Sequence, residues 1–268
     1  MTVRVSFVIP TLNQATFIRR CIDSCLAQQL ADAEILVRDG GSTDGTQELL
    51  ASYGSAIQWV SRKDGGQSDA VNQGVYEATG DIIAWINSDD FYAESTVIRS
   101  IVDVFEQQSA ADIVYGNGLL VDGKGNALRE YPTRSPVPFK RLLIYPVSFV
   151  LQPAALFRKS LFMDAGALNP NYHFSLDFEL WLRMVPLARQ MVHIPRTVAR
   201  ATVHDTAKSV RGVFQQLRET ESIKHQYAER CALSHLERLQ MHWGCLKNRL
   251  YASAITVGLY RPWMSRQT

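Results

Sequence analysis

The chain has 268 residues, of which 46% are hydrophobic and 20% are charged, and its formal net charge is +2. This length is enough for one large α/β domain, with or without a helical appendage, and it allows a sizeable buried core. The small net charge, and the lack of a basic run interleaved with aromatic residues before residue 200, argue against nucleic acid as a partner.

The cysteines and the apolar segments bear on the cellular compartment. Cys21 and Cys25 share one face of a predicted helix, whereas Cys231 and Cys245 are far apart, so neither a zinc-ligand pair nor a disulfide framework is indicated. We expect reduced core thiols in a cytoplasmic chain. The N-terminus has no signal-peptide layout, and prolines interrupt the longest apolar region, residues 142–157, so any membrane contact is expected to be peripheral.

The first half of the chain alternates two hydrophobic patterns. Short runs rich in β-branched residues predict strands, and longer runs with helical spacing predict helices. The strands are expected at 3–9, 34–38, 57–60, 82–86 and 112–115, the helices within 13–29 and at about 44–50, 67–79 and 95–107, and a hairpin at 122–126. This alternation predicts a mostly parallel sheet covered by helices on both faces.

The second half has a different character. A strand is expected at 152–157, a helix at 175–184, and a helical pattern from residue 208 onward. This last segment is cationic, with acids only at Glu219, Glu221, Glu229 and Glu237, and it is aromatic towards its end, with Trp243, Tyr251, Tyr260 and Trp263. Two interpretations remain open: a helical pair packed on the sheet domain, or an amphipathic segment at a membrane surface.

One apolar run, residues 82–86, ends abruptly in the polar cluster Asn87, Ser88, Asp89 and Asp90. A buried parallel strand places such a cluster at its carboxyl end, where open α/β sheets bind ligands. Adjacent carboxylates there are costly unless a cation offsets their repulsion, which favours a metal-diphosphate site. Alternatively, the two aspartates cap the helix that follows.

Five motifs occur in an order typical of one enzyme family: 7–13, 39–46, 74–81, 87–90 and 177–183. In this order they resemble the family-2 glycosyltransferases of the GT-A fold, over roughly the first two hundred residues. The resemblance implies a Rossmann-like, mostly parallel α/β sheet sandwiched by helices, followed here by a helical C-terminal extension. We therefore expect a GT-A domain at 1–207, with a nucleotide-sugar-binding half at 1–118 and an acceptor half at 119–207, and an extension at 208–268.

The resemblance implies roles for several residues around the nucleotide sugar. Pro10, Thr11 and Asn13 match the loop that lies against the nucleoside, and Asp39 matches the carboxylate that accepts from the base's ring N–H. A carboxylate suits a pyrimidine or guanine imide edge because it accepts hydrogen bonds and donates none. Further nucleotide-sugar contacts are expected from Asp69 and Asn72, on the helix that faces this loop, and from Asn87 and Ser88.

The resemblance also implies a metal, Mn²⁺ or Mg²⁺. Asn87-Ser88-Asp89 occupies the position of the Asp-x-Asp motif, with Asp89 as the metal ligand. Asn87 replaces the first, commonly acidic, residue and brings no charge, so metal binding is expected to depend more on bound diphosphate. His204 resembles the histidine of a loop that closes over the diphosphate, and is the second candidate ligand. Asp90 is expected to orient backbone or a neighbouring side chain.

Asp177 matches the catalytic base at the head of a helix. It would deprotonate the acceptor hydroxyl, and direct displacement would invert the anomeric configuration. Glu179 does not share its helical face and is expected to be structural. Gln152 matches a segment that lines the acceptor side.

These expectations define an inverting, metal-dependent glycosyltransferase that uses a nucleoside-diphosphate sugar, with a UDP-sugar favoured. The acceptor would be a glycan or lipid-linked glycan in bacterial cell-surface polysaccharide synthesis, reached from the cytoplasm, with a peripheral place at the inner membrane face as one form of this expectation. Two alternatives remain: a nucleotidyltransferase that makes sugar nucleotides, and a non-enzymatic nucleotide-binding scaffold. The first would want a Gly-rich loop after the first strand, and residues 10–19 contain no glycine.

Overall fold

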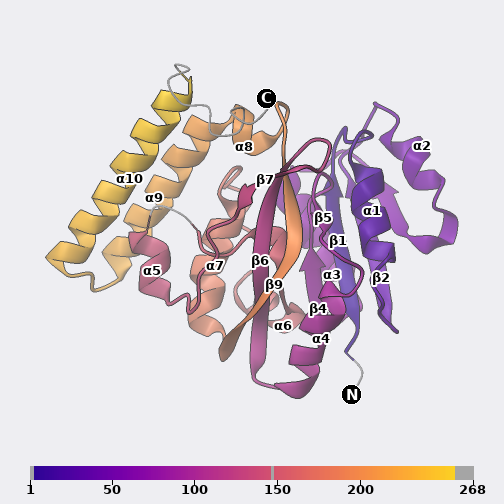
Figure 1. Ribbon diagram of the computed structural model, residues 1–268, viewed down its shortest axis with the longest axis horizontal. Helices are drawn as coiled ribbons and strands as arrows, with labels where there is room; N and C mark the ends of the chain where they lie inside the picture. Colours follow the sequence, from indigo (N-terminus) through magenta and orange to yellow (C-terminus); the bar gives the residue numbers. More distant parts are fainter. Residues whose placement is uncertain (1–2, 146–147, 257–268) are drawn as a thin grey trace.

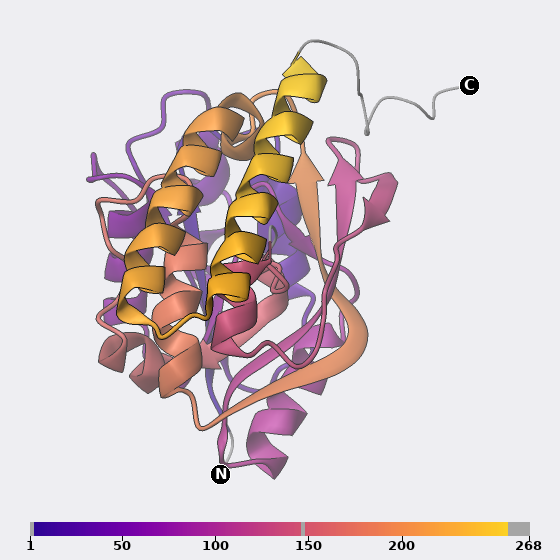
Figure 2. The ribbon, with the colours of Figure 1, turned by 90° about the vertical axis from the view of Figure 1, so that its left-hand side faces the viewer.

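The computed structural model describes residues 3–145 and 148–256. A central sheet carries helices on both faces, and two C-terminal helices, α9 (Val213–Arg230) and α10 (His235–Thr256), lie side by side on one flank (Figure 1). Figure 2, turned so that this flank faces the viewer, shows the two helices side by side in front of the rest of the molecule.

Within the described residues, nine strands form one sheet in the order β3-β2-β1-β4-β8-β6-β9-β5, with β7 paired to β6. The strands are β1 (Val5–Thr11), β2 (Ala33–Asp39), β3 (Gln58–Ser61), β4 (Ile82–Trp85), β5 (Phe91–Tyr92), β6 (Ala111–Asp122), β7 (Ala127–Glu130), β8 (Ala155–Arg158) and β9 (Gln190–Val203). The pairs β3-β2, β2-β1 and β1-β4 are parallel. The carboxyl ends of β1, β2 and β4 therefore meet at one edge of the sheet.

The remaining helices cover the two faces of this sheet. They are α1 (Ile18–Leu26), α2 (Thr46–Ala51), α3 (Gln67–Glu77), α4 (Val97–Gln107), α5 (Phe139–Ile144), α6 (Lys159–Asp164), α7 (Leu176–Leu187) and α8 (Lys208–Arg211), with short 3-10 turns η1 (Gly54–Ala56) and η2 (Gln152–Ala154). The predicted helices at 44–50, 67–79, 95–107 and 175–184 correspond to α2, α3, α4 and α7.

The alternation of side chains along each strand divides the core in two. Phe7 and Ile9 of β1 point into one apolar cluster with α1 and α4, while Val8 points into the other with α3 and α7. In β4, Ile83 and Trp85 belong to the second cluster and their neighbours to the first. This is the period-2 pattern of a strand buried on both faces, and it confirms the predicted α/β sheet covered by helices on both faces.

Two predicted elements differ from the structure, and one long strand was not predicted. The first helix begins only at Ile18, because Asn13 adopts a positive φ of 53° and its N–H donates to Ser42 Oγ instead of starting a helical turn. The strand expected at 152–157 begins with the turn η2 and becomes β8 only at Ala155. The long strand β9 was not expected at all, although it pairs with β6 over most of its length.

The helical pattern predicted after residue 208 is confirmed over the described part of the extension, as α8, α9 and α10; residues 257–268 lie outside the described residues. Ile223 of α9 joins the apolar cluster of α7, and Lys140 of α5 forms an ion pair with Glu237 of α10 at 3.2 Å. These contacts favour the interpretation of a helical pair packed on the sheet domain. Among the described residues, no helix has the length and apolar character needed to cross a membrane.

Candidate functional site at the carboxyl edge of the sheet

The loops after β1 and β2 are bonded to one another at the edge where these strands end. Asn13 N–H donates to Ser42 Oγ at 2.7 Å, and Thr43 N–H donates to Asn13 Oδ1 at 2.9 Å. Gly40 N–H donates to the carbonyl of Thr11 at 2.9 Å. The predicted nucleoside loop, Pro10 to Asn13, is thus joined to the loop of Asp39, as the sequence interpretation requires.

Asp39 ends β2 and is buried. Its Oδ2 accepts from Ser42 N at 3.0 Å and from Ser61 Oγ at 2.5 Å, and Ser42 Oγ donates to Oδ1. A carboxylate offers about four lone-pair directions, so one stays open for a further donor. The hydroxyl of Thr11 is buried and finds no hydrogen-bond partner among the described residues. A buried hydroxyl without a hydrogen-bond partner, close to this carboxylate, is typical of a ligand-binding site.

Asp89 and His204 meet at this edge, although they are 115 positions apart in the chain. Asp89 follows β4, His204 follows β9, and His204 Nε2 lies 3.1 Å from Asp89 Oδ2. The other ring nitrogen, Nδ1, lies 2.8 Å from Thr206 Oγ1, and the ring packs against Phe17 with centroids 4.4 Å apart. The two candidate metal ligands are therefore brought together, and Thr206 and Phe17 hold the ring of His204.

This pair of donors suits a divalent metal that accepts both oxygen and nitrogen. Carboxylate and imidazole together favour Mn²⁺ over Mg²⁺, which prefers oxygen alone. Among the described residues, no group of three or more His, Cys, Asp or Glu side chains gathers in a way that could hold a metal. The residues present thus fit a site in which the protein supplies Asp89 and His204, and the substrate phosphates and water supply the remaining ligands.

Asp90, the next residue after Asp89, is buried. Its Oδ1 accepts from Thr202 N–H of β9 at 2.9 Å. Burial, and next the negative charge of Asp89, raise the pKa of Asp90 well above its ordinary value. The interpretation of Asp90 as a residue that orients backbone is confirmed, since it ties the loop after β4 to the strand that carries His204.

A chain of side-chain amides crosses the same edge. Buried Gln152 donates to the carbonyl of Trp85 at 2.5 Å and accepts from Asn87 Nδ2 at 3.3 Å. Asn87 Oδ1 accepts from Gln67 Nε2 at 2.8 Å, and Gln67 Oε1 accepts from Lys208 Nζ at 3.1 Å. Sequence reasoning missed Gln67, although its place directly after the Gly65-Gly66 turn was a signal for a loop that approaches a ligand.

The remaining candidate residues for nucleotide-sugar binding differ in their contacts. Ser88 is buried beside Asp89, and Asp69 Oδ2 accepts from Gly65 N–H at 3.0 Å, which shapes the loop that leads to Gln67. Asn72, by contrast, donates to the carbonyl of Leu168 at 2.9 Å and accepts from its N–H at 2.8 Å. These two bonds tie the amide of Asn72 to the loop after α6, and its contact with the nucleotide stays a prediction.

Asp177 lies half-buried in the first turn of α7, where the helix dipole favours a carboxylate. Burial raises its pKa, and the positive charge of Lys208 opposes that shift. The negative charge of Asp177, after burial, also raises the pKa of Tyr131. Lys208 therefore connects the two parts of the site, because it bonds Gln67 on one side and lies within electrostatic range of Asp177 on the other.

Glu179 is structural, as expected. It is buried, its carboxylate accepts from Arg183 Nε at 2.9 Å and Nη2 at 2.6 Å, and Tyr227 Oη donates to it at 2.8 Å. With both oxygens engaged inside the protein, Glu179 does not compete with Asp177 as a base.

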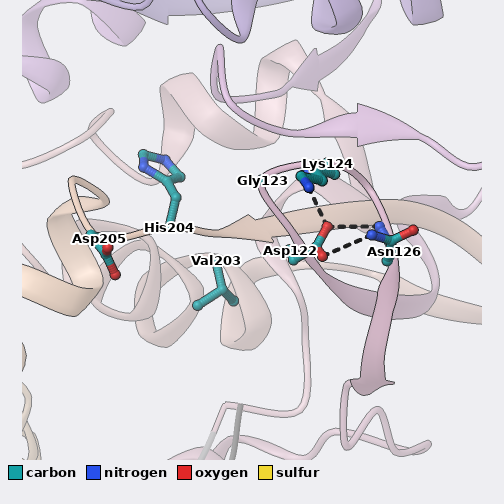
Figure 3. A pocket seen from close by; sticks show the side chains of 7 residues that line it. All are labelled: Asp122, Gly123, Lys124, Asn126, Val203, His204 and Asp205. Atoms are coloured by element: carbon teal, nitrogen blue, oxygen red, sulfur yellow. Dashed lines mark hydrogen bonds between the residues drawn. The ribbon is translucent and has the colours of Figure 1, made fainter. Parts of the chain in front are cut away.

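An open cavity of about 380 Å³ borders His204. Figure 3 shows Asp122, Lys124 and Asn126 gathered at the β6-β7 turn, with His204 and Asp205 across from them. Asp122 accepts from the N–H groups of Lys124 and Asn126 at 2.9 and 2.8 Å, so the turn itself is rigidly held. Sequence reasoning predicted this hairpin but did not connect it to the site.

The order of the strands, and the position of Asp89 and Asp90 directly after β4, define a GT-A-type fold with a candidate nucleotide-sugar site. A family model described as "Glycosyl transferase family 2" matches residues 6–166, which is more than half of the chain. The chain belongs to glycosyltransferase family 2.

Related sequences carry consistent names. A Rickettsia felis protein named "Uncharacterized glycosyltransferase" is 30% identical over 196 residues, which cover 69% of this chain and 32% of that protein. A Mycobacterium bovis protein named "PGL/p-HBAD biosynthesis glycosyltransferase" is 28% identical over 185 residues, covering 66% of this chain and 68% of that protein. The chain therefore spans about a third of the Rickettsia felis relative.

Solved structures share the fold. The S. aureus TarS fragment 1-349 in complex with UDP has a TM-score of 0.67 at 16% identity and covers 94% of this chain and 73% of that one. The mannosyltransferase PcManGT from Pyrobaculum calidifontis, in complex with GDP-Man and Mn²⁺, has a TM-score of 0.68 at 17% identity and covers 98% of this chain and 82% of that one. The similarity includes the C-terminal helical part, since both alignments span nearly the whole chain.

Proposed function

We propose that this protein transfers a sugar from a nucleoside-diphosphate sugar to a hydroxyl of a glycan or lipid-linked glycan in cell-surface polysaccharide synthesis. The observation that carries the proposal is the contact between Asp89 and His204 at the edge where the loops of Pro10 and Asp39 also meet. A carboxylate and an imidazole at this place suit a metal-bound diphosphate. The Mycobacterium bovis relative is named as a biosynthesis glycosyltransferase, which supports a reaction that adds a sugar to an acceptor.

In the proposed mechanism Asp177 accepts the proton of the acceptor hydroxyl. The hydroxyl oxygen forms a bond to the anomeric carbon while the bond from that carbon to the diphosphate oxygen breaks, and attack opposite to the leaving group inverts the configuration. The raised pKa of Asp177 suits a base, because a stronger base takes the proton more readily. A divalent metal, when bound, supplies positive charge to the departing diphosphate.

The donor favoured by the residues is a UDP-sugar, with a GDP-sugar as the competing choice. The open acceptor position of Asp39 suits the imide N–H that uracil and guanine share, and it would repel a ring nitrogen that only accepts. TarS fragments in complex with UDP and UDP-GlcNAc, and PcManGT in complex with GDP-Man, bind the two classes in related folds.

We also propose that the extension touches the inner face of the membrane, with the protein in the cytoplasm. The support is a stripe of five exposed apolar side chains on α10, spaced by three and four residues: Leu236, Leu239, Trp243, Leu246 and Leu250. Met241 and Cys245, on the opposite face of the helix, are buried, so the stripe points outward. Lys247 packs on the Trp243 ring at 5.9 Å, and a basic residue beside an apolar stripe suits anionic lipid.

Calorimetric titration of UDP, GDP and dTDP, each with and without Mn²⁺, tests the donor site. We expect one nucleotide to bind in a Mn²⁺-dependent way, and Asp89→Ala to remove that dependence. Asp81→Ala is the matched control, because Asp81 is exposed at the opposite end of β4. Binding that ignores both the metal and Asp89 would contradict the proposal.

A second assay separates the alternatives. A glycosyltransferase releases nucleoside diphosphate from a nucleotide sugar, a nucleotidyltransferase releases pyrophosphate from a nucleoside triphosphate and a sugar phosphate, and a scaffold releases neither. Coupled detection of the two products therefore distinguishes the three functions with one enzyme preparation.

A further inference from the structure

The turn that precedes Asp177 is held by a residue far away in the chain. Glu219 of α9 accepts three hydrogen bonds from consecutive backbone N–H groups: His173 to Oε1 at 2.7 Å, Phe174 to Oε2 at 2.7 Å and Ser175 to Oε2 at 2.5 Å. These three N–H groups lie immediately before α7, with Ser175 at its N-cap, so the Glu219 carboxylate pairs backbone donors that lead into the helix. Ser175, at the N-cap position, makes no capping bond with its side chain, whereas the Asp177 carboxylate accepts hydrogen bonds from the backbone N–H groups of Phe178 and of Asp177 itself.

Two further contacts hold the same turn. The buried Ser175 places its hydroxyl 2.6 Å from Thr220 Oγ1 and 3.3 Å from the carbonyl of Gln216, both in α9. Gly212, at the junction of α8 and α9, packs so closely on Phe174 that a Cβ at this position would lie 1.9 Å from its ring. Backbone, hydroxyl and ring of the turn are thus each fixed by the extension.

We propose that Glu219 is a positioning residue for the catalytic base, and that α9 is in this way part of the transfer machinery. This inference rests on the proposed role of Asp177. The base sits two residues beyond Ser175, in the first turn of α7, so a shift of the 173–175 backbone moves the carboxylate away from the acceptor hydroxyl. Loss of alignment by about 1 Å is enough to cost roughly a hundredfold in rate.

The charge of Glu219 also acts on the base. Beside burial, its negative charge raises the pKa of Asp177, while the positive charge of Lys208 lowers it. The groups in electrostatic contact with Asp177 are therefore Lys208 of α8, Glu219 of α9 and Tyr131 after β7. Removing the Glu219 charge shifts the pKa of Asp177 downward, which a purely structural role for Glu219 would not do.

The test uses the full chain with three variants. Glu219→Ala removes every acceptor, Glu219→Gln keeps one acceptor oxygen without the charge, and Glu229→Gln is the matched control, since Glu229 is exposed on the same helix. The substrate is UDP-GlcNAc or GDP-mannose, whichever the wild type hydrolyses faster, with water in place of the unidentified acceptor. Hydrogen-deuterium exchange of residues 173–177 reports on the turn independently of turnover.

For Glu219→Ala we expect faster exchange at 173–175 and a kcat about 10- to 100-fold lower, with the donor KM within about twofold of wild type. For Glu219→Gln we expect a smaller loss of kcat and an acidic limb of the pH-rate profile displaced to lower pH. Wild-type kcat in Glu219→Ala, or a fall in kcat matched by lost donor binding and a general rise in exchange, would overturn the inference.

Asp177→Asn keeps the two proposals apart. If it abolishes turnover while Glu219→Ala does not, the base role stands and the inference about Glu219 fails. If the Asp177→Asn variant turns over at the wild-type rate, Asp177 is not the base. The proposed mechanism then fails, and the inference about Glu219 that rests on it fails as well.

Discussion

Asp90 accepts a hydrogen bond of 2.9 Å from the backbone N–H of Thr202, and so fastens β9 to the loop that follows β4. Two residues after Thr202 comes His204, whose ring contacts Asp89. This bond joins the neighbours of the two candidate metal ligands, because Asp90 follows Asp89 in the chain and Thr202 lies two residues before His204. The bond gives the buried carboxylate of Asp90 a structural role beside Asp89.

Asp90→Ala should therefore impair both stability and metal binding. It leaves the N–H of a buried residue, Thr202, without its acceptor, which costs about 1 to 3 kcal/mol. We expect a lower urea midpoint and weaker Mn²⁺-dependent binding of the cognate nucleoside diphosphate by calorimetry. Asp81→Ala serves as the control for a loss of one negative charge. A variant that loses stability but binds Mn²⁺ normally would show that Asp90 does not align the pair.

Asp177→Asn should separate binding from turnover. The amide is isosteric with the carboxylate but cannot accept the acceptor's proton, so we expect kcat to fall by about 10² to 10⁴. Calorimetry of the nucleoside diphosphate should be unchanged, since in the proposed mechanism Asp177 contacts the acceptor and not the diphosphate. The same binding isotherm with a rate within a few-fold of wild type would contradict the assignment.

Lys224 gives a prediction about pH. It is 2% exposed, donates to the carbonyl of Tyr145, and burial lowers its pKa to about 8. In the unfolded chain its pKa returns to about 10.5, so between these values the unfolded state binds more protons and stability rises with pH.

Lys224→Met should remove this dependence. At pH 7 the variant avoids the cost of a buried ammonium and should be more stable by about 1 to 3 kcal/mol, a difference that shrinks as the pH approaches 10. Urea unfolding at pH 7 and pH 10 measures both. Lys63→Met, at an exposed lysine, is the control and should show no change in slope between the two pH values.

The α10 stripe predicts binding to anionic vesicles. A charge placed in its centre, as in Leu246→Asp, should abolish co-flotation with phosphatidylglycerol vesicles, because a carboxylate is costly in the apolar layer and is repelled by the headgroups. Gln215→Asp adds the same charge at an exposed position of α9 and should float as wild type does. If the Leu246→Asp variant still floats with the vesicles, the stripe is not the surface that binds the membrane.

Local pattern was enough to predict most of the sheet and the layers around it. β1, β2 and β4 are short, apolar runs closed by polar turns, and α4 carries buried residues at helical spacing, so each element is defined by its own residues. The cluster at Asp89 could be predicted for the same reason, because the end of a buried strand fixes where the following residues lie.

What the sequence did not predict depends on distant contacts. The side chains of β9 are exposed, half-buried or buried in no regular alternation, and the segment contains Pro195. It is a strand because it pairs with β6 over most of its length. Asn72 lies on the expected helix, and its amide bonds the backbone of Leu168, a contact that no local pattern could show. The partner of the turn before Asp177 lies 46 positions further along, in Glu219.

The distance along the chain between these partners has a consequence for biosynthesis. The donor loops, residues 10–13, 39–42 and 87–89, are made first, His204 is made 115 positions after Asp89, and Glu219 later still. A polypeptide released from the ribosome before α9 would lack Glu219, whose carboxylate accepts the hydrogen bonds of the turn before Asp177. Those hydrogen bonds can therefore form only after α9 has been made, when the loops that follow β1, β2 and β4 are already complete.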